Sequence, residues 1–527
     1  MLRINRLLIV CAVLCVGVLC VVHECHGQGA RGCETWRRFV HEMESGEEPT
    51  IHDFSYAGYR YGEVDLPRVE GPVFDVRDYG AKGDGKHDDR EAIELATKAA
   101  NEAGGGVVYL SAGMYAISER GTDAGPMMLN VAGGVVFRGD GDGEGGTVLW
   151  MKDRLDALNP KQMWSTPYFF QVNGVAKRKI EKLTEIVGFA QKESRRVKVG
   201  DVGKLAVGQW VTVELRDKAI VDEVLLPYEV EPQMTVLRNE GLLLRFNMQI
   251  VGIEGDEVEF GSPFRMRVDP QYGWTIRSYR YAEEVGVEGI RFKGNWQEQF
   301  KHHKNAVHDS GWSYLQVNRV VNGWVRDCTF EDVSNALAVI RSANVTVRDV
   351  VIEGNGGHAA THVSDSSNCM FVNVADKAGQ YHSCGVAQRA SGNVFYRCQW
   401  VKDTSFESHA NYPMATLFDR CQGGFMLNRM GGHTSNQPNH MGGLTFWNFR
   451  GEGEPLRLLE FWRTKSKWGK VLPPVIVGYH GNRTTFDRKQ VLVLESQGRP
   501  VYPESLYEAQ LERRLGELPE WLVGYAK

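Results

Sequence analysis

Short segments with apolar residues at strand spacing recur through the second half of the chain. Their first residues lie 22, 24, 24, 23 and 28 positions apart, and a second strand is expected about eight residues upstream of most of them. Such a period, with two or three short strands in each repeat, predicts a coiled parallel β-structure and not a stack of helix pairs. The segments are 325–328, 347–350, 371–374, 395–398, 418–421 and 446–449, and the upstream strands are expected to end at Val317, Val339, Val363, Ala387 and Ala410.

The last residues of these segments predict a column of side chains inside the coil. Successive coils stack about 4.8 Å apart, so equivalent residues lie on top of one another. The column contains Cys328, Cys398 and Cys421 among apolar residues. We expect these cysteines to be free thiols that pack as small apolar side chains, with disulfides between coils as the alternative.

The region before the repeats predicts a helix that covers the end of the coil. Residues 74–89 precede an amphipathic stretch, 90–103, and then three glycines and a strand, 107–110. Asp88 or Asp89 can cap this helix, and the helix protects the open strand edge. The Gly-Asp-Gly at 83–85 is interpreted as structural, because a P-loop ending is missing and only part of an EF-hand spacing is present.

The first 27 residues have the pattern of an export signal. Arg3 and Arg6 precede an apolar run at 7–22, although a retained membrane anchor is the alternative. We therefore expect a secreted or periplasmic protein with no membrane partner after the signal is removed. The predicted regions are the signal peptide (1–27), an N-terminal arm (28–72), the first part of the coil with its capping helix (73–194), a β-rich insertion (195–270), the coils that carry the site (271–500), and a C-terminal helix and tail (501–527) that begins at a capping box of Ser505 and Glu508.

The composition is that of a globular protein, with 42% hydrophobic and 24% charged residues. The net charge of −5 lacks the basic excess that nucleic-acid binding requires, so nucleic acid is excluded as a partner. The oligomeric state stays open.

Two groups of motifs resemble known families. The opening at 74–89 and the strand region 104–115 resemble the pectate-lyase-like superfamily of right-handed parallel β-helices. Other segments are similar to a bacterial branch of the DUF4955 type. This resemblance implies an all-β solenoid that acts on or binds a polysaccharide, as a lyase, hydrolase, epimerase or non-catalytic spike. No cofactor is assigned, although calcium remains open. The segments of the second group are 53–59, 302–309, 406–410 and 438–440.

Nine of the fifteen histidines lie between His302 and His440, and the expected register gathers many of them on one outer face. Imidazole, amide and carboxylate groups there can bind sugar hydroxyls and exchange protons. Solvated surface histidines are the simpler alternative, and His358-x-x-x-His362 leaves a histidine-bound transition metal open although no metal is assigned. The predicted substrate-binding residues are His303, His358, His362, Gln388, Glu407, Asn411 and His440.

The chemistry favoured by these residues is β-elimination of a uronic-acid polymer. A lyase needs a base, here His382 or His409, and a cation for the sugar carboxylate, here Arg389 or Lys304. Arg389 could instead simply pair with Asp365. Tyr412, or alternatively Tyr381, would be the acid. A glycoside hydrolase needs two carboxylates about 5 to 9.5 Å apart, and Glu407 is the one clear acid on the face. A hydrolase and a non-catalytic polysaccharide-binding β-helix are the alternatives.

Overall fold

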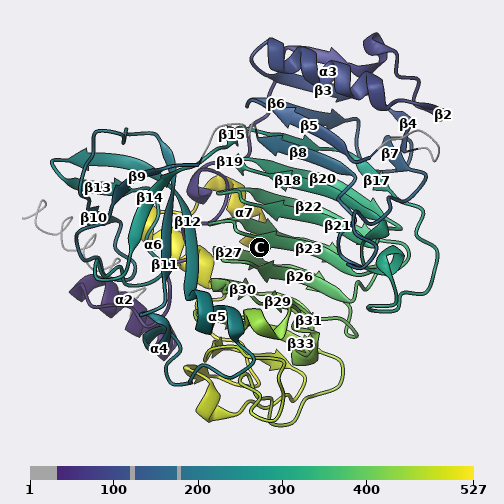
Figure 1. Cartoon of the computed structure of the whole chain (residues 1–527). Coiled ribbons are helices and arrows are strands. Elements are labelled where there is room, and N and C mark those ends of the chain that lie inside the picture. Colours follow the sequence, from purple (N-terminus) through teal and green to yellow (C-terminus); the bar gives the residue numbers. More distant parts are fainter. Residues whose placement is uncertain (1–31, 119–124, 175–179, 527) are drawn as a thin grey trace, which may run out of the picture.

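A computed structural model describes residues 32–118, 125–174 and 180–526 of the chain. Its main body is a stack of parallel strands that runs from the helix α3 (Arg90–Glu102) at one end to the C-terminal loops at the other (Figure 1). The predicted signal at 1–27 lies outside the described residues. Among the described helices, none has the length and apolar character needed to cross a membrane.

Three parallel ladders of strands form the coil, and together they confirm the predicted right-handed parallel β-helix. The first ladder is β1 (Val73–Asp75), β3 (Gly106–Leu110), β6 (Val135–Gly139), β16 (Gly286–Glu288), β20 (Trp324–Glu331), β22 (Thr346–Glu353), β24 (Met370–Val372), β27 (Ser391–Tyr396), β30 (Met414–Asp419), β32 (Leu444–Trp447), β34 (Val475–Val477) and β36 (Val493–Glu495). The second is β2 (Asp84–Asp88), β4 (Gly113–Ser118), β7 (Thr147–Met151), β17 (Arg291–Lys293), the later halves of β20 and β22, β25 (Ala375–Asp376), β28 (Gln399–Trp400), β31 (Gln422–Gly424), β33 (Arg450–Glu452) and β35 (His480–Gly481). The third is β5 (Met127–Val131), β8 (Phe170–Gly174), β18 (Ser313–Asn318), β21 (Asn335–Ile340), β23 (Ala359–Ser364), β26 (His382–Ala387) and β29 (Glu407–His409).

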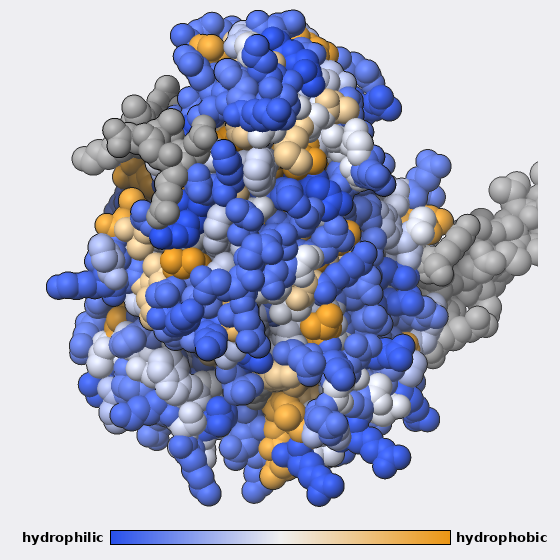
Figure 2. Space-filling view, turned by 90° about the vertical axis from the view of Figure 1, so that its right-hand side faces the viewer, coloured by the Kyte–Doolittle hydropathy of each residue, from blue (hydrophilic) through white to orange (hydrophobic). Residues whose placement is uncertain are grey.

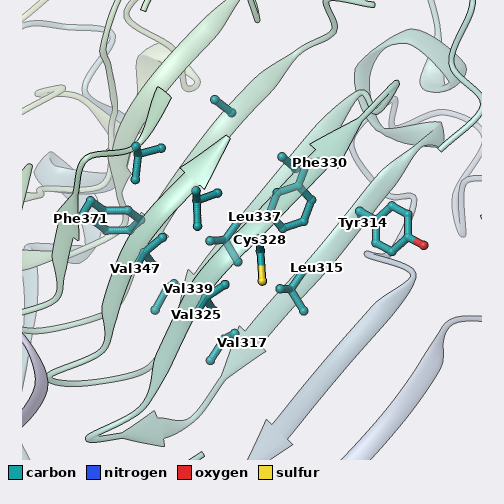
Figure 3. Packing of buried hydrophobic residues seen from close by; sticks show 14 of the residues in the cluster. Tyr314, Leu315, Val317, Val325, Cys328, Phe330, Leu337, Val339, Val347 and Phe371 are labelled. Atoms are coloured by element: carbon teal, nitrogen blue, oxygen red, sulfur yellow. The ribbon is translucent and has the colours of Figure 1, made fainter. Parts of the chain in front are cut away.

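The first ladder has the register that the sequence repeats predict. Phe371, Phe395 and Phe418 pair in successive strands, and their rings stack with centroids 4.7 and 4.8 Å apart. Side chains from neighbouring coils fill the interior in continuous rows (Figure 3). Cys398 and Cys421 belong to the same buried core and are free thiols. The interior is therefore close-packed along the whole stack.

The third ladder does not have the register that we predicted. Val363 pairs with Val386 and not with Ala387, and Val386 pairs with Ser408 and not with Ala410. The number of residues between equivalent positions of this ladder and the first one grows along the chain. The reason is that the turns after β26 and β29 are longer than the turn after β23. A constant offset of eight residues was the wrong assumption.

The helix α3 caps the stack as predicted. Asp88 accepts a hydrogen bond from the backbone N–H of Arg90, whereas the Asp89 carboxylate accepts from the N–H groups of Lys82 and Gly83. The Gly-Asp-Gly segment is thus held by a buried carboxylate of the same chain, in agreement with its structural interpretation.

The insertion is an antiparallel sheet that is larger than the predicted 195–270. It comprises β9 (Lys182–Glu185), β10 (Arg196–Lys198), β11 (Trp210–Asp217), β12 (Leu242–Glu254), β13 (Glu257–Phe260) and β14 (Trp274–Ser278), with the short helices α4 (Val221–Val224) and α5 (Thr235–Glu240). Asn247 joins it to the coil, since its backbone N–H donates to Ser367 Oγ and its amide donates to the carbonyl of Asp365. The sheet therefore rests on the turns after the third ladder.

Both ends of the chain cover the outside of the first ladder. The arm contains α2 (Glu34–Ser45), whose first backbone N–H groups bind the carboxylate of Glu495 in β36. At the other end, α6 (Leu506–Leu515) begins at the predicted cap, where Ser505 Oγ accepts from the N–H of Glu508, and α7 (Glu520–Ala526) follows.

The face shown in Figure 2 is mostly hydrophilic, with apolar side chains in separate patches.

Asp419 fastens α6 to the coil and makes this contact sensitive to pH. Its Oδ2 accepts from Ser505 Oγ and from the N–H of Tyr507, and burial raises the pKa of the carboxyl to about 7. The folded chain then keeps a proton that the unfolded chain loses above pH 3.8, so the contribution of Asp419 to stability falls as the pH rises toward 7. We compare the free energy of unfolding of Asp419→Asn with that of the wild type. The difference between them should change by about 2 kcal/mol in favour of the variant from pH 5 to pH 8. Urea unfolding at both pH values measures it.

The matched control for this variant is Asp78→Asn, at an exposed position. An equal stability difference between Asp419→Asn and the wild type at both pH values would show that the buried carboxyl does not titrate in this range.

The cysteine column gives a second prediction. Mass spectrometry of the unreduced protein, with the thiols alkylated only after unfolding, should find Cys398 and Cys421 unlinked. A peptide pair joined by a disulfide would contradict the packing of these side chains as apolar core residues.

Candidate functional site

Three histidines from separate segments meet at one end of the third ladder. His302 lies in the loop between β17 and β18, His358 lies just before β23, and His382 is the first residue of β26. Their ring centroids are 5.3 to 5.6 Å apart. Parallel stacking of coils brings His358 and His382 together. The loop between β17 and β18 places His302 beside them.

Aromatic and cationic groups stack beside these histidines. The ring of Tyr381 lies 4.2 Å from that of His302 in a stacked arrangement, and the guanidinium of Arg429 lies 3.6 Å from the same tyrosine ring. At such short distances the two groups must occupy opposite faces of Tyr381. His303 continues the stack, since its ring centroid is 3.7 Å from that of His302.

A buried carboxyl faces the cluster from the next coil. Glu407 begins β29 and is 3% exposed, and its Oε1 lies 3.8 Å from His382 Nε2 and 4.0 Å from His409 Nε2. Within the described part of the chain this carboxyl has no hydrogen bond. The side chain of His409 is 42% exposed, so it borders both the buried carboxyl and the solvent.

Burial sets the protonation states of the site. It lowers the pKa of His302 to about 4 and that of His358 to about 3, and it holds the pKa of His382 well below its usual value. Repulsion between the neighbouring imidazoles acts in the same direction. Burial also raises the pKa of Glu407 to about 8. At neutral pH the site thus contains neutral imidazoles, a largely protonated carboxyl and the positive charge of Arg429.

Seven of the predicted site residues lie in or beside this cluster. His358, His382, Glu407 and His409 are brought together, and His362 joins them because its ring centroid is 6.1 Å from that of His409. His303 stacks at the outer end. Lys304 belongs to the same loop, where its Nζ lies 3.1 Å from Glu298 Oε2.

The other five predicted residues are placed elsewhere. Arg389 forms a bidentate ion pair with Asp365, with Nε–Oδ1 and Nη2–Oδ2 distances of 2.5 and 2.6 Å. Tyr412 is buried in the core of the insertion, and His440 is fully buried with its Nε2 3.0 Å from Thr416 Oγ1. Gln388 and Asn411 occupy the turns after β26 and β29, beside Arg389 and Tyr412. Because these turns follow the strands, they lie at the end of the third ladder opposite to His382.

Sequence reasoning gave no role to Arg429 and left His302 out of the site. His302 belongs to a segment between two strands, 302–309, to which no repeat register applies. Arg429 lies in the short helix η4 (Leu427–Arg429), outside the strand repeats, so its position against Tyr381 has no signal in the spacing of the sequence.

The donor atoms at the cluster do not fit calcium. Calcium prefers six to eight oxygen ligands, whereas the group formed by His302, His358 and His382 offers three imidazole nitrogens. Among the described residues this is the one group of three or more histidine, cysteine or carboxylate side chains close enough to hold a metal ion. The arrangement gives no support to a calcium requirement.

Comparisons with protein families match two segments of the chain. Residues 73–147 match the family described as "Rhamnogalacturonase A/epimerase, pectate lyase-like", and residues 379–525 match "Domain of unknown function (DUF4955)". The first segment is thus similar to pectate-lyase-like proteins, and the second is similar to the DUF4955 family. The second match contains Tyr381, His382, Glu407, His409 and Arg429.

Curated relatives share a short part of the chain. Mannuronan C5-epimerase AlgE1 of Azotobacter vinelandii is 39% identical over 122 residues, which are 23% of this chain and 8% of the relative. Alginate lyase 7 of the same organism is 46% identical over 83 residues, which are 16% of this chain and 9% of the relative. The chain thus spans less than a tenth of the length of either relative.

Two solved structures align with most of this chain at low sequence identity. The A-module of mannuronan C-5 epimerase AlgE4 from Azotobacter vinelandii aligns with 79% of this chain and 90% of its own, at 15% identity and a TM-score of 0.37. The tailspike gp49 of Pseudomonas phage LKA1 aligns with 80% of this chain and 72% of its own, at 12% identity and a TM-score of 0.45.

Gly431 provides a test of the geometry around Glu407. A Cβ atom at this position would lie 2.0 Å from Glu407 Oε1 and 2.4 Å from His409 Cδ2. Its backbone tolerates other residues, because its φ is not in the left-handed region. We expect Gly431→Ala to fold and to displace the Glu407 carboxyl, visible as a shift of the His409 imidazole resonances in NMR.

The control for this variant is Gly143→Ala, because a Cβ there meets no atom within 4 Å. Unchanged His409 resonances in Gly431→Ala would contradict the close approach of this loop to β29.

Proposed function

We propose that the chain is a polysaccharide lyase that cleaves a uronic-acid polymer by β-elimination at this cluster. The observation that carries the proposal is that Arg429 forms no ion pair in the described part of the chain. This part-buried guanidinium forms no ion pair with a carboxylate among the described residues, whereas Arg389 is already paired with Asp365. The Asp403 carboxylate acts on Arg429 only from beyond ion-pair distance, so the part-buried guanidinium is able to bind a carboxylate of the substrate.

The neighbouring side chains can supply the remaining steps. Arg429 would neutralise the sugar carboxylate and so stabilise the negative charge that develops next to it when the adjacent proton is removed. His409 would be the base, since it is neutral and half-exposed, whereas His382 is 4% exposed. The Tyr381 hydroxyl would donate a proton to the leaving oxygen.

The relatives agree with the substrate class of this proposal. A C5-epimerase and an alginate lyase are among the curated proteins that match the chain, and removal of a proton at C5 is a step that both reactions can share. We therefore propose an exported protein with a polysaccharide partner, in line with the leading segment at 1–27.

A glycoside hydrolase is the second candidate, and Glu407 is the observation that favours it. A carboxyl whose pKa is raised by burial is the usual general acid of these enzymes. The second carboxyl could be Asp309, which is 2% exposed and lies 3.8 Å from His303 Nε2. New reducing ends without an unsaturated sugar product would favour this reaction.

The test of the lyase is turnover on a panel of uronic-acid polymers, followed by the ultraviolet absorbance of the unsaturated product. We expect Arg429→Gln and His409→Ala each to lower kcat by about 10²–10⁴-fold with melting temperatures near that of the wild type. Loss of one proton-transfer or charge-stabilising group has this magnitude, whereas loss of a solvated side chain has almost none.

The matched controls are Arg483→Gln and His87→Ala, which change exposed residues of the same types. Wild-type turnover in either site variant would exclude the role assigned to that residue. A wild-type protein that leaves every polymer intact would instead point to a non-catalytic polysaccharide-binding β-helix.

A further inference from the structure

We propose that His302, His358 and His382 bind a divalent transition-metal ion of the zinc class, with a fourth position open to water. Each residue offers one nitrogen, and the three nitrogens lie within 4.8 Å of one another. This site goes beyond the lyase proposal, because it holds whether or not the chain cleaves a polymer.

The distances are close to those of a metal-loaded site. A tetrahedral zinc ion about 2.1 Å from each imidazole nitrogen needs nitrogens about 3.4 Å apart. The cluster must therefore contract by about 1 Å or slightly more. His302 can supply this movement, since it lies in a loop and neither of its ring nitrogens has a hydrogen-bond partner among the described residues.

Hydrogen bonds already orient His358 as a ligand. Its Nδ1 lies 2.8 Å from the carbonyl oxygen of Asp309, and a carbonyl can only accept. The proton is thus on Nδ1, and Nε2 carries the free lone pair. Metal-binding histidines are commonly fixed in this way by a backbone carbonyl on the other nitrogen.

His382 independently offers a buried nitrogen that has no partner among the described residues. The residue is 4% exposed, and its Nδ1 is buried without a hydrogen-bond partner in the described chain. Its Nε2 lies 3.8 Å from Glu407 Oε1. A metal ion on Nδ1 would satisfy the unpaired nitrogen and leave Nε2–H to the carboxyl, which is the usual arrangement of carboxylate, histidine and zinc.

The surrounding charges permit a cation at this point. Arg429 opposes it, but the ring of Tyr381 lies between this guanidinium and His302. Glu407 can become a carboxylate and offset the metal charge. Three nitrogen donors of borderline softness fit zinc, cobalt, nickel or copper better than calcium or magnesium, and three histidines with an open fourth position are typical of catalytic zinc sites.

The test uses tag-free protein that has been stripped with a chelator and titrated with Co²⁺ as a spectroscopic substitute for Zn²⁺. We expect one equivalent to bind with the visible absorption of tetrahedral cobalt, and Zn²⁺ to displace it. His302→Ala and His358→Gln should each weaken binding at least about 100-fold, which is the upper range for loss of an outer-shell partner. The control His87→Ala removes an exposed histidine and should bind like the wild type.

Two results would overturn the site: no saturable binding of one equivalent by the wild type, or unchanged affinity in both ligand variants. Anomalous scattering from zinc-soaked crystals of the wild type gives an answer that does not depend on the folding of any variant. An ion between the three rings supports the proposal, and zinc bound only elsewhere refutes it. Metal binding without turnover of any polymer would reject the lyase and keep the metal site.

Discussion

Stacking of equivalent residues at the repeat distance of parallel strands, about 4.8 Å, is the constraint on which the rest of this structure depends. Inside the coil it lines up phenylalanine rings whose centroids are 4.7 and 4.8 Å apart. Outside the coil the same distance places His358, His382 and Glu407 of consecutive turns within reach of one another. Polar groups that are 20 or more residues apart in the sequence therefore form one cluster through the regular coiling of the backbone alone.

The interior of the coil could be predicted from the sequence because its side chains tolerate little variation. The column of Phe371, Phe395 and Phe418 must keep its register to stay buried, and the sequence spacing records this. The turns after the third ladder have no such requirement. They lengthen by one residue in each of two coils, so the predicted register failed from Val386 onward. Arg389 pairs with Asp365 and Tyr412 packs in the core of the insertion, both past the ends of their strands.

The repeats predict which strand residues reach the candidate site, whereas the contacts that loop residues make there have no such signal. His382 and Glu407 were predicted because each begins a strand of the third ladder. Arg429 approaches Tyr381 from a segment outside the strands, and nothing in its neighbours along the sequence indicates that contact. Two further segments outside the strands contact the cluster. The loop with His302 contacts His382, and the segment with Gly431 lies against Glu407 and His409. The coil thus sets the base of the site, and the loops decide which groups face a ligand.

The central claim is that Arg429 and His409 face the carboxylate-bearing sugar of a bound polymer. A crystal structure of the wild-type protein with an oligouronate that is bound but not cleaved, for example at low temperature, tests this most directly. We predict a sugar carboxylate within hydrogen-bonding distance of the Arg429 guanidinium, and the adjacent sugar carbon about 3 to 3.5 Å from an imidazole nitrogen of His409. An oligosaccharide bound along another ladder, or one whose carboxylates all avoid Arg429, would contradict the account.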